Sequence, residues 1–316
     1  MLFENNFLNN GMRCVYSDGV YIDDAWEPAG VTEQFLGNAE IYHERYFSDA
    51  YWKYLLDRGL TCATVDIPNT ARVLDIGSGS GNTALIAATI FNGSEVFASD
   101  ISPQLLKILM KLANNAGLTN VKSFCFDLHK DFFAPASFDL VIGGAILHHM
   151  LDPLAALKNV AKWLKPGAPI IMMEPMEAGG HLMCAVYQTI LDECGEELDP
   201  RIAHFLNAMV QDYEARFGVP RVKPWTGNLD DKWLFNRTYL KWLVNELGLR
   251  LDSVNAMSDD SSRWIESMIR GNLSTSGNAT VPTPPRMWEV VAEFDQGIST
   301  TVKRYLMQEA IIVLRK

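Results

Sequence analysis

The sequence contains few cysteines, and none in a pattern typical of a metal site or a disulfide framework. Its five cysteines are spread over 316 residues and include no C-x-x-C pair, so we expect free thiols in a reducing compartment. No apolar run approaches the roughly 18–20 residues that span a bilayer. The start, M-L-F-E-N-N-F, lacks the basic and apolar regions of a signal peptide. We therefore expect a cytoplasmic protein with no membrane partner.

Positive charge is also scarce. The chain has 27 Lys and Arg against 38 Asp and Glu, a formal net charge of −11 and an isoelectric point of about 5.0. Proteins that bind nucleic acids normally gather basic residues into a patch that neutralises phosphates. The basic residues here are scattered, so a nucleic-acid partner is not expected. The length and the 48% hydrophobic content are sufficient for one large core with additional segments.

Short apolar strands alternate with helical segments in the middle of the chain, and this alternation returns near the end. Such a pattern predicts right-handed crossovers and a parallel sheet that helices cover on both faces. The predicted strands span residues 71–76, 95–99, 121–126, 138–142, 168–173, 250–257 and 310–314.

The remaining segments precede or interrupt this α/β core. Six of the eight tryptophans lie in them. These tryptophans either pack the segments onto the core or line an apolar pocket over the carboxyl edge of the sheet, where open α/β sheets bind ligands. The predicted parts are an N-terminal helical lid (1–60), a cofactor-binding core (61–175), a helical cap insertion (176–235), and the rest of the core with a second, irregular insertion near 258–300 (236–316).

A glycine-rich loop follows the first core strand in V-L-D-I-G-S-G-S-G-N, residues 73–82. Its glycines, Gly77, Gly79 and Gly81, have the spacing G-x-G-x-G. The dinucleotide fingerprint G-x-G-x-x-G requires glycine where Asn82 stands, and the Walker pattern requires a lysine that is absent. The spacing therefore disfavours a nicotinamide oxidoreductase.

Three aspartates lie at or near the ends of the first three core strands. Asp75 would repel a pyrophosphate but suits a cationic group, while the free N–H groups of the following helix suit a carboxylate. Asp100 stands where nucleotide-binding α/β folds bind ribose hydroxyls; helix capping is the alternative, but Ser102 is the better N-cap. Asp127 is placed to meet the amine of an adenine. S-adenosylmethionine, a cationic adenosyl amino acid, satisfies all three.

These motifs, with F-D-L-V-I-G-G-A-I-L-H-H (138–149) and L-K-P-G-A-P-I-I-M-M-E-P (164–175), resemble those of class I S-adenosylmethionine-dependent methyltransferases. The resemblance covers about residues 71–175. It implies a Rossmann-like, mostly parallel sheet of seven strands with an antiparallel last strand, together with a mainly helical cap. It also implies that an aromatic helix before the core closes over the cofactor. The predicted cofactor-binding residues are Asp75, Gly77, Ser78, Gly79, Gly81, Asp100, Ile101, Phe126, Asp127, Leu128, Gly143 and Tyr46.

His148, His149 and Glu174 are the candidate catalytic residues, because they follow the fourth and fifth core strands at the edge that faces the cofactor. A histidine can take a proton from a hydroxyl or an ammonium group. The alternative is that the histidines orient the loop backbone and that Glu174 merely hydrogen-bonds a loop. No set of side chains resembles the divalent-metal site of some O-methyltransferases, so no metal is expected.

The sequence therefore predicts methyl transfer from S-adenosylmethionine to a small, largely apolar or aromatic metabolite of specialised metabolism. The alternative is a protein that binds S-adenosylmethionine without transferring its methyl group and supports, for example, cyclisation or rearrangement. Stoichiometric formation of S-adenosylhomocysteine separates the two. No motif supports a protein acceptor, and a homodimer through the additional segments is left open.

Overall fold

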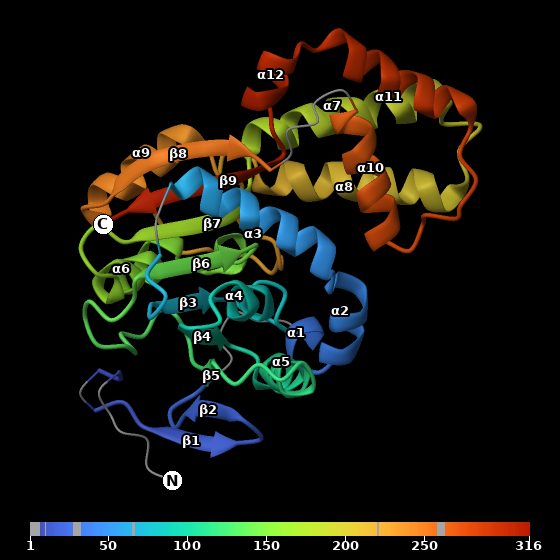
Figure 1. The fold of residues 1–316 in the computed structure, drawn as a ribbon. Helices are drawn as coiled ribbons and strands as arrows, with labels where there is room; N and C mark the ends of the chain where they lie inside the picture. Colours follow the sequence, from blue (N-terminus) through green and yellow to red (C-terminus); the bar gives the residue numbers. More distant parts are fainter. Residues whose placement is uncertain (1–6, 10, 28–32, 65–66, 220, 258–262) are drawn as a thin grey trace.

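The computed structural model describes residues 7–9, 11–27, 33–64, 67–219, 221–257 and 263–316. A mixed sheet of nine strands runs through the molecule in the order β1-β2-β5-β4-β3-β6-β7-β9-β8 (Figure 1). The five central strands are parallel, and β9 lies antiparallel between β7 and β8, which confirms the predicted fold class. The strands are β1 Cys14–Ser17, β2 Val20–Asp23, β3 Arg72–Ile76, β4 Glu95–Asp100, β5 Val121–Cys125, β6 Leu140–Gly144, β7 Pro169–Pro175, β8 Arg250–Ala256 and β9 Glu309–Arg315.

The N-terminal segment corrects the prediction of a wholly helical lid. β1 and β2 form an antiparallel hairpin, and β2 pairs in parallel with β5, so the hairpin extends the sheet from the seven predicted strands to nine. The turn residues Asp18 and Gly19 have φ of 50° and 87°. Positive φ at both positions matches the twist of the flanking strands. Helices α1 (Glu33–Leu36), α2 (Ala39–Tyr46) and α3 (Asp49–Ala63) follow.

Helices cover both faces of the sheet (Figure 1). Successive residues of a strand point to opposite faces, and both faces of β3 are apolar: Val73 packs in the cluster with α3, α4 and α5, and Leu74 in the cluster with α6 and α9. A parallel sheet buried on both faces requires such continuous apolar strands. These helices are α4 Ala84–Ile90, α5 Pro103–Asn115, α6 Pro153–Trp163 and α9 Arg237–Leu247.

A four-helix cap stands beside the sheet and has an apolar core of its own (Figure 1). The second insertion, which we expected to be irregular, supplies two of its helices. Ile265, Ile269 and Leu273 recur at intervals of four residues and bury one face of α10, the spacing of an amphipathic helix. The cap helices are α7 Glu177–Cys194, α8 Pro200–Arg216, α10 Trp264–Thr275 and α11 Pro285–Gly297, and α12 Thr300–Tyr305 then leads back to β9.

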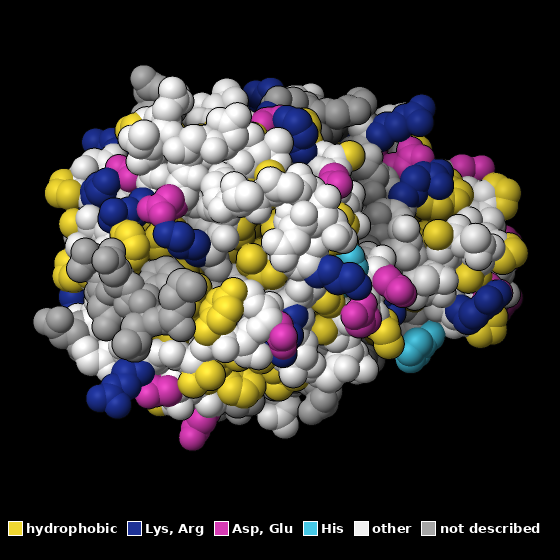
Figure 2. Space-filling model, turned by 60° about the horizontal axis from the view of Figure 1, so that its bottom comes forward, with side chains coloured by type: hydrophobic (Ala, Val, Ile, Leu, Met, Phe, Trp, Pro, Cys, Tyr) yellow, Lys and Arg dark blue, Asp and Glu magenta, His cyan; other side chains and the backbone are white. Residues whose placement is uncertain are grey.

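The surface carries charges of both signs. On the face shown in Figure 2, Lys and Arg side chains lie next to Asp and Glu side chains. Ion pairs also occur among the described residues, for example between Lys130 and Asp23 at 2.8 Å. Among the helices of the described residues, none combines the length and apolar character that crossing a bilayer requires.

Candidate functional site

The glycine loop lies between β3 and α4, at the carboxyl edge of the sheet. Gly77, Gly79 and Gly81 have φ of 66°, 51° and 110°. Residues that carry a Cβ rarely adopt these backbone angles. A Cβ at Gly77 would lie 2.3 Å from the Ile146 side chain, whereas one at Gly79 would meet no atom within 4 Å. The loop is therefore packed against the segment after β6 on one side and open at Gly79.

Asp75 lies beneath this loop. Its side chain is fully buried, and both carboxylate oxygens lie 2.8 Å from Thr83 Oγ1, just before α4. The structure thus gives Asp75 a contact that the sequence did not predict. Its predicted contact with an ammonium group of the ligand stays a prediction.

We expect Asp75 to make the stability of the fold depend on pH. Burial raises its pKa to about 7, although hydrogen bonds from Thr83 oppose the shift. Folding therefore takes up a proton between the pKa of the unfolded chain and about pH 7, and the stability from this group falls as pH rises through that window. Urea unfolding between pH 5.5 and 7.5 should show a downward slope that is weaker in Asp75→Asn. Equal slopes in both proteins would contradict the prediction.

Asp100 ends β4 directly beside the loop. Its two carboxylate oxygens accept hydrogen bonds from the backbone N–H of Gly79 at 2.9 Å and of Ser102 at 2.8 Å. Burial raises the pKa of Asp100, although these N–H groups oppose the shift. Ser102, as predicted from the sequence, caps α5 by accepting from Leu105 N. Asp100 is thus fixed at the loop, and its role toward a ribose stays a prediction.

Two other predicted cofactor-binding residues, Ser78 and Ile101, make hydrogen bonds within the chain that support the site. The Ser78 hydroxyl is buried, donates to the Asp75 carbonyl at 3.0 Å and accepts from Ser99 N at 3.1 Å, so it ties β3 to β4. The Ile101 carbonyl accepts from Trp26 Nε1 at 2.8 Å. Both residues support the loop and its neighbour Asp100.

The predicted adenine end contains two buried apolar side chains. Phe126 is 1% exposed and stacks on Phe132 with ring centroids 3.9 Å apart, in the core beneath α6. Leu128 belongs to the same buried cluster, so both side chains pack in the core, and the role of these residues toward the adenine stays a prediction. Asp127 is partly exposed and accepts from His129, whose Nδ1 is 2.7 Å away. Burial raises the pKa of Asp127, but the hydrogen bonds from His129 outweigh it and lower the pKa overall.

The aromatic helix α2 lies against the loop, as the resemblance implied. Its Tyr46 carbonyl accepts from Asn82 Nδ2 at 3.3 Å, and His43 Nδ1 lies 2.8 Å from Ser80 Oγ. The Tyr42 and Tyr46 rings pack at 4.7 Å. His43 therefore connects the helix to the loop.

The segment after β6 is held by a single buried carboxylate. Glu174 is 1% exposed, and its oxygens accept from the backbone N–H of Ile146 (3.1 Å), Leu147 (2.8 Å) and His148 (3.2 Å). The His148 ring also binds it, with Nδ1 2.7 Å from Oε2. Glu174 is therefore a positioning residue and does not face the cleft, which corrects its assignment as catalytic.

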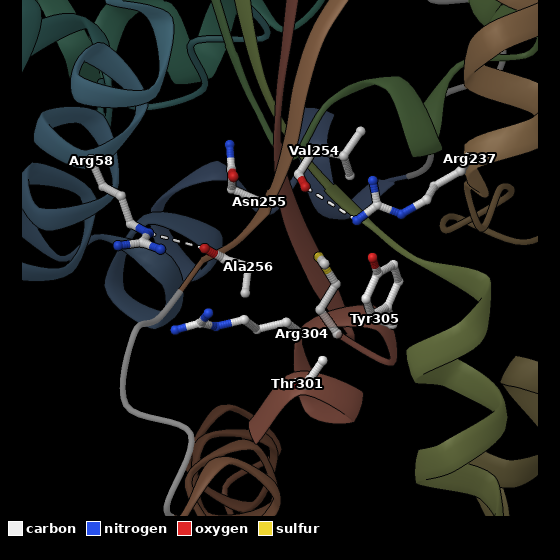
Figure 3. A pocket seen from close by; sticks show the side chains of 9 residues that line it. Arg58, Arg237, Val254, Asn255, Ala256, Thr301, Arg304 and Tyr305 are labelled. Atoms are coloured by element: carbon white, nitrogen blue, oxygen red, sulfur yellow. Dashed lines mark hydrogen bonds between the residues drawn. The ribbon is translucent and has the colours of Figure 1, made fainter. Parts of the chain in front are cut away.

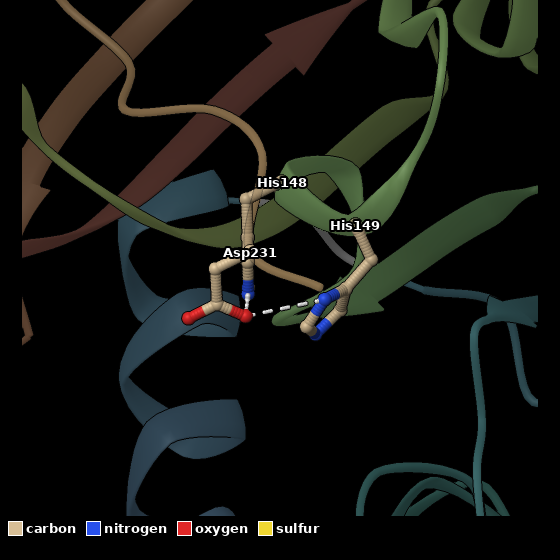
Figure 4. Close-up of side chains that lie close together, drawn as sticks. All are labelled: His148, His149 and Asp231. Atoms are coloured by element: carbon tan, nitrogen blue, oxygen red, sulfur yellow. Dashed lines mark ion pairs between the residues drawn. The ribbon is translucent and has the colours of Figure 1, made fainter. Parts of the chain in front are cut away.

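Asp231 joins the two histidines, although it lies about eighty residues later in the chain. Its Oδ1 is 3.6 Å from His148 Nε2 and 3.3 Å from His149 Nδ1 (Figure 4). Burial lowers the pKa of His148, but Glu174 and Asp231 outweigh it and raise the pKa overall. Burial and the neighbouring His148 lower the pKa of His149. One ligand atom from each of these three residues lies within 4.8 Å of the others, so the group has the spacing of a cation site.

Known proteins share this architecture and its loop. Residues 73–167 match the family model described as "Methyltransferase domain". The uncharacterized protein YafE of Escherichia coli (strain K12) is 33% identical over 216 residues, which are 68% of this chain and 82% of that protein. A ubiquinone biosynthesis O-methyltransferase of Xanthomonas campestris pv. campestris (strain B100) is 35% identical over 112 residues, 35% of this chain and only 45% of the relative.

This chain belongs to the family of class I S-adenosylmethionine-dependent methyltransferases. A solved structure described as a putative sarcosine dimethylglycine methyltransferase from Galdieria sulphuraria has the same fold, with a TM-score of 0.51 and 16% identity over 89% of this chain and 98% of that one. The cofactor of the methyltransferase is S-adenosylmethionine. The site suits it, because Asp100 offers fixed acceptor oxygens beside the open position at Gly79.

Two glycines at the end of β6, Gly143 and Gly144, pack closely against neighbouring side chains. A Cβ at Gly143 would lie 2.3 Å from Met172 Cε, and one at Gly144 would lie 2.7 Å from the Trp52 ring of α3. A side chain at Gly143, one of the predicted cofactor-binding residues, would therefore have to displace the Met172 side chain on β7. Trp52, which the sequence left between packing and pocket lining, packs on β6 beside Thr83.

A cavity of about 530 Å³ opens elsewhere, at the carboxyl end of β8 between α3 and α12 (Figure 3). Three arginines, Arg58, Arg237 and Arg304, are among its lining residues. Arg58 Nε donates to the Ala256 carbonyl at 3.0 Å. Neither the glycine loop nor the histidine pair contributes to this lining, so the cavity is separate from the methyltransferase site.

Proposed function

We propose that this methyltransferase methylates a small, largely apolar or aromatic metabolite and that His148 or His149 takes the proton which the acceptor loses. The observation that carries the proposal is the placement of the histidine pair. Ile146, two residues before His148, lies against Gly77 of the cofactor loop. The imidazoles therefore stand at the same edge of the sheet as the predicted methyl donor.

The surroundings of the histidines support an apolar acceptor. The Phe35 ring meets His149 edge-on at 5.3 Å and lies 5.2 Å from the Tyr42 ring. Aromatic side chains with a few polar groups are typical of small-molecule sites. One relative is a ubiquinone biosynthesis O-methyltransferase, and the net charge of −11 opposes a nucleic-acid acceptor; both points support a small molecule.

The chemistry depends mainly on orientation. When bound, S-adenosylmethionine supplies an electrophilic methyl carbon, and alignment of donor and acceptor can be worth on the order of 7–11 kcal/mol. Glu174 fixes the backbone of the histidine segment and accepts from His148 Nδ1. A carboxylate acceptor at Nδ1 selects the tautomer in which Nε2 carries the lone pair. Glu174 thereby aims Nε2 of His148 at the side of the site where Asp231 lies.

The acceptor class can be tested with isotope-labelled S-adenosylmethionine and a metabolite extract. We expect a labelled small product and one S-adenosylhomocysteine per product, detected by mass spectrometry. Tight cofactor binding with no labelled product and no S-adenosylhomocysteine would instead support the alternative, a protein that binds the cofactor without transferring methyl.

Removing the histidine side chains should lower kcat while leaving cofactor affinity nearly unchanged. A positioned proton acceptor contributes about 10²–10⁴-fold to the rate. With the acceptor that the labelling experiment identifies, we therefore expect kcat to fall by this factor in His148→Ala or His149→Ala. His204→Ala is the matched control, because His204 is exposed on α8. Steady-state kinetics and calorimetry with S-adenosylhomocysteine measure the two effects. Full activity in both variants would exclude a histidine base.

A further inference from the structure

The group formed by His148, His149 and Asp231 combines side chains from two distant segments. The histidines belong to the short 3₁₀ helix Leu147–His149 after β6, and Asp231 to the loop before α9. Figure 4 shows the Asp231 carboxylate facing both imidazoles. We propose that these three side chains bind one divalent transition-metal ion, such as Zn²⁺ or Mn²⁺. Only the catalytic use of the ion rests on the proposed function; its binding does not.

The distances are those of atoms that share an ion. Metal–nitrogen and metal–oxygen bonds of about 2.0–2.2 Å place two ligands of one ion about 3–3.5 Å apart. Asp231 Oδ1 lies 3.6 Å from His148 Nε2 and 3.3 Å from His149 Nδ1. The Asp230 carbonyl oxygen accepts a hydrogen bond from the same nitrogen of His149 at 3.1 Å; on metal binding this nitrogen would give up its proton, and the carbonyl oxygen would be a fourth potential ligand. Small rotations of the side chains are therefore enough to close the site.

A second carboxylate orients the first ligand. Glu174 Oε2 lies 2.7 Å from His148 Nδ1, so the proton is held at Nδ1 and the lone pair at Nε2 faces Asp231. Metal-binding histidines usually donate their other ring N–H to a carboxylate or carbonyl in this way. A lone pair that faces a carboxylate oxygen is repelled unless a cation lies between them. That cation is either a proton on Nε2 or a metal ion.

The charges around the group favour a bound cation. Four carboxylates and two basic side chains act electrostatically on the two imidazoles or on Asp231. Arg216 approaches Oδ2 of Asp231, at 3.8 Å, and so leaves Oδ1 to the histidines. Lys232 donates to the Asp230 carbonyl at 3.1 Å. The carboxylates are Asp212, Glu174, Asp231 and Glu309, and the basic side chains are Arg216 and Lys232.

A metal ion here would change the proposed mechanism in one respect. As a Lewis acid it would lower the pKa of a bound hydroxyl, so that the hydroxyl would release its proton to solvent water; the histidines would then act as ligands, and the acceptor would be methylated as a bound alkoxide or enolate. The acceptor would then carry a hydroxyl or an enolisable carbonyl group. The earlier expectation of no metal rested on the absence of a local motif, and Asp231 lies outside any such motif.

Calorimetric titration tests the site directly. The full-length protein, dialysed against a chelator, is titrated with Zn²⁺ and with Co²⁺, whose absorption spectrum reports nitrogen and oxygen ligands. We expect one equivalent to bind, and affinity to fall at least about 10-fold in Asp231→Asn and His149→Gln. Glu174→Gln should weaken binding by about 10–100-fold. Asp230→Asn is the matched control, because it keeps the backbone oxygen that approaches His149.

Two results would overturn the proposal: no binding of either ion, or the same stoichiometric binding in a folded Asp231→Asn protein. Circular dichroism and affinity for S-adenosylhomocysteine establish that the variants fold. The titration needs neither methyl donor nor acceptor, so failure of the proposed methyl transfer leaves its result unaffected. Loss of the ion in Asp231→Asn with retention in Asp230→Asn would support the site.

Discussion

Asp100→Ala is expected to weaken the binding of S-adenosylmethionine about 100-fold or more. The Asp100 oxygens are held by Gly79 N and Ser102 N, so they are oriented before the cofactor arrives. A hydrogen bond to a charged group contributes about 1.5–3 kcal/mol. In Asp100→Ala, each of the two ribose hydroxyls would lose its hydrogen bond to the carboxylate. A loss of about 3 kcal/mol corresponds to more than 100-fold in affinity. The freed N–H of Gly79 also loosens the loop, which adds to the effect.

Calorimetry with S-adenosylhomocysteine, which cannot react, measures this change. Asp192→Ala is the control, because Asp192 is an exposed carboxylate on α7 that accepts from Gln188. The affinity of this variant for S-adenosylhomocysteine should stay within about twofold of that of the parent protein. Unchanged affinity in a folded Asp100→Ala protein would remove Asp100 from the ribose site.

Asp295→Ala is expected to lower the free energy of unfolding by about 3–5 kcal/mol, because it removes a buried ion pair of the cap. Asp295 and Lys303 form an ion pair at 3.0 Å whose side chains are both 4% exposed. The same carboxylate accepts from Ile265 N and Glu266 N at the start of α10, each at 3.0 Å. The substitution removes the charged partner of the buried Lys303 ammonium, which keeps its hydrogen bond to the Asp295 carbonyl, and it also takes the carboxylate acceptor from two backbone donors.

Urea unfolding followed by tryptophan fluorescence measures this loss. Asp57→Ala serves as the comparison, because its ion pair with Lys53 is exposed and such pairs contribute at most about 1 kcal/mol. The Asp295 pair lies in the cap, away from the glycine loop, so the affinity for S-adenosylhomocysteine should stay within about twofold under native conditions. A loss below about 1 kcal/mol for Asp295→Ala would contradict the structure of this pair.

Local sequence patterns were sufficient for the core of the fold. The strands from β3 to β7 and the final β9 lie where apolar runs predicted them, within one to two residues at most ends. The hairpin β1–β2 was equally predictable, because Y-S-D-G-V-Y places Asp18-Gly19 between alternating apolar residues, a strong hairpin signal. The helices of the second insertion were harder to predict, since turn-rich residues separate the apolar positions of α10 from those of α11.

The candidate site was only partly predictable. The three glycines have the positive φ values that their spacing suggested, because such a turn is specified by the loop itself. The sequence did not show that the side chains of Phe126 and Leu128 lie in the buried core, because adjacency to Asp127 does not tell which face of the sheet a side chain occupies. Glu174 was assigned to the cleft, yet its carboxylate is used entirely by the histidine segment.

The sequence by itself determined the α/β core, the glycine loop and the family to which the chain belongs. These depend on residues that are close together in the chain, whose spacing fixes strand, turn and helix. The tertiary structure decided the composition of the cap and of the catalytic edge. Asp231 meets His148 and His149 only because the loop before α9 packs against the segment after β6, where Lys232 N donates to the His148 carbonyl at 2.7 Å. A contact over that separation depends on packing, which no local pattern records.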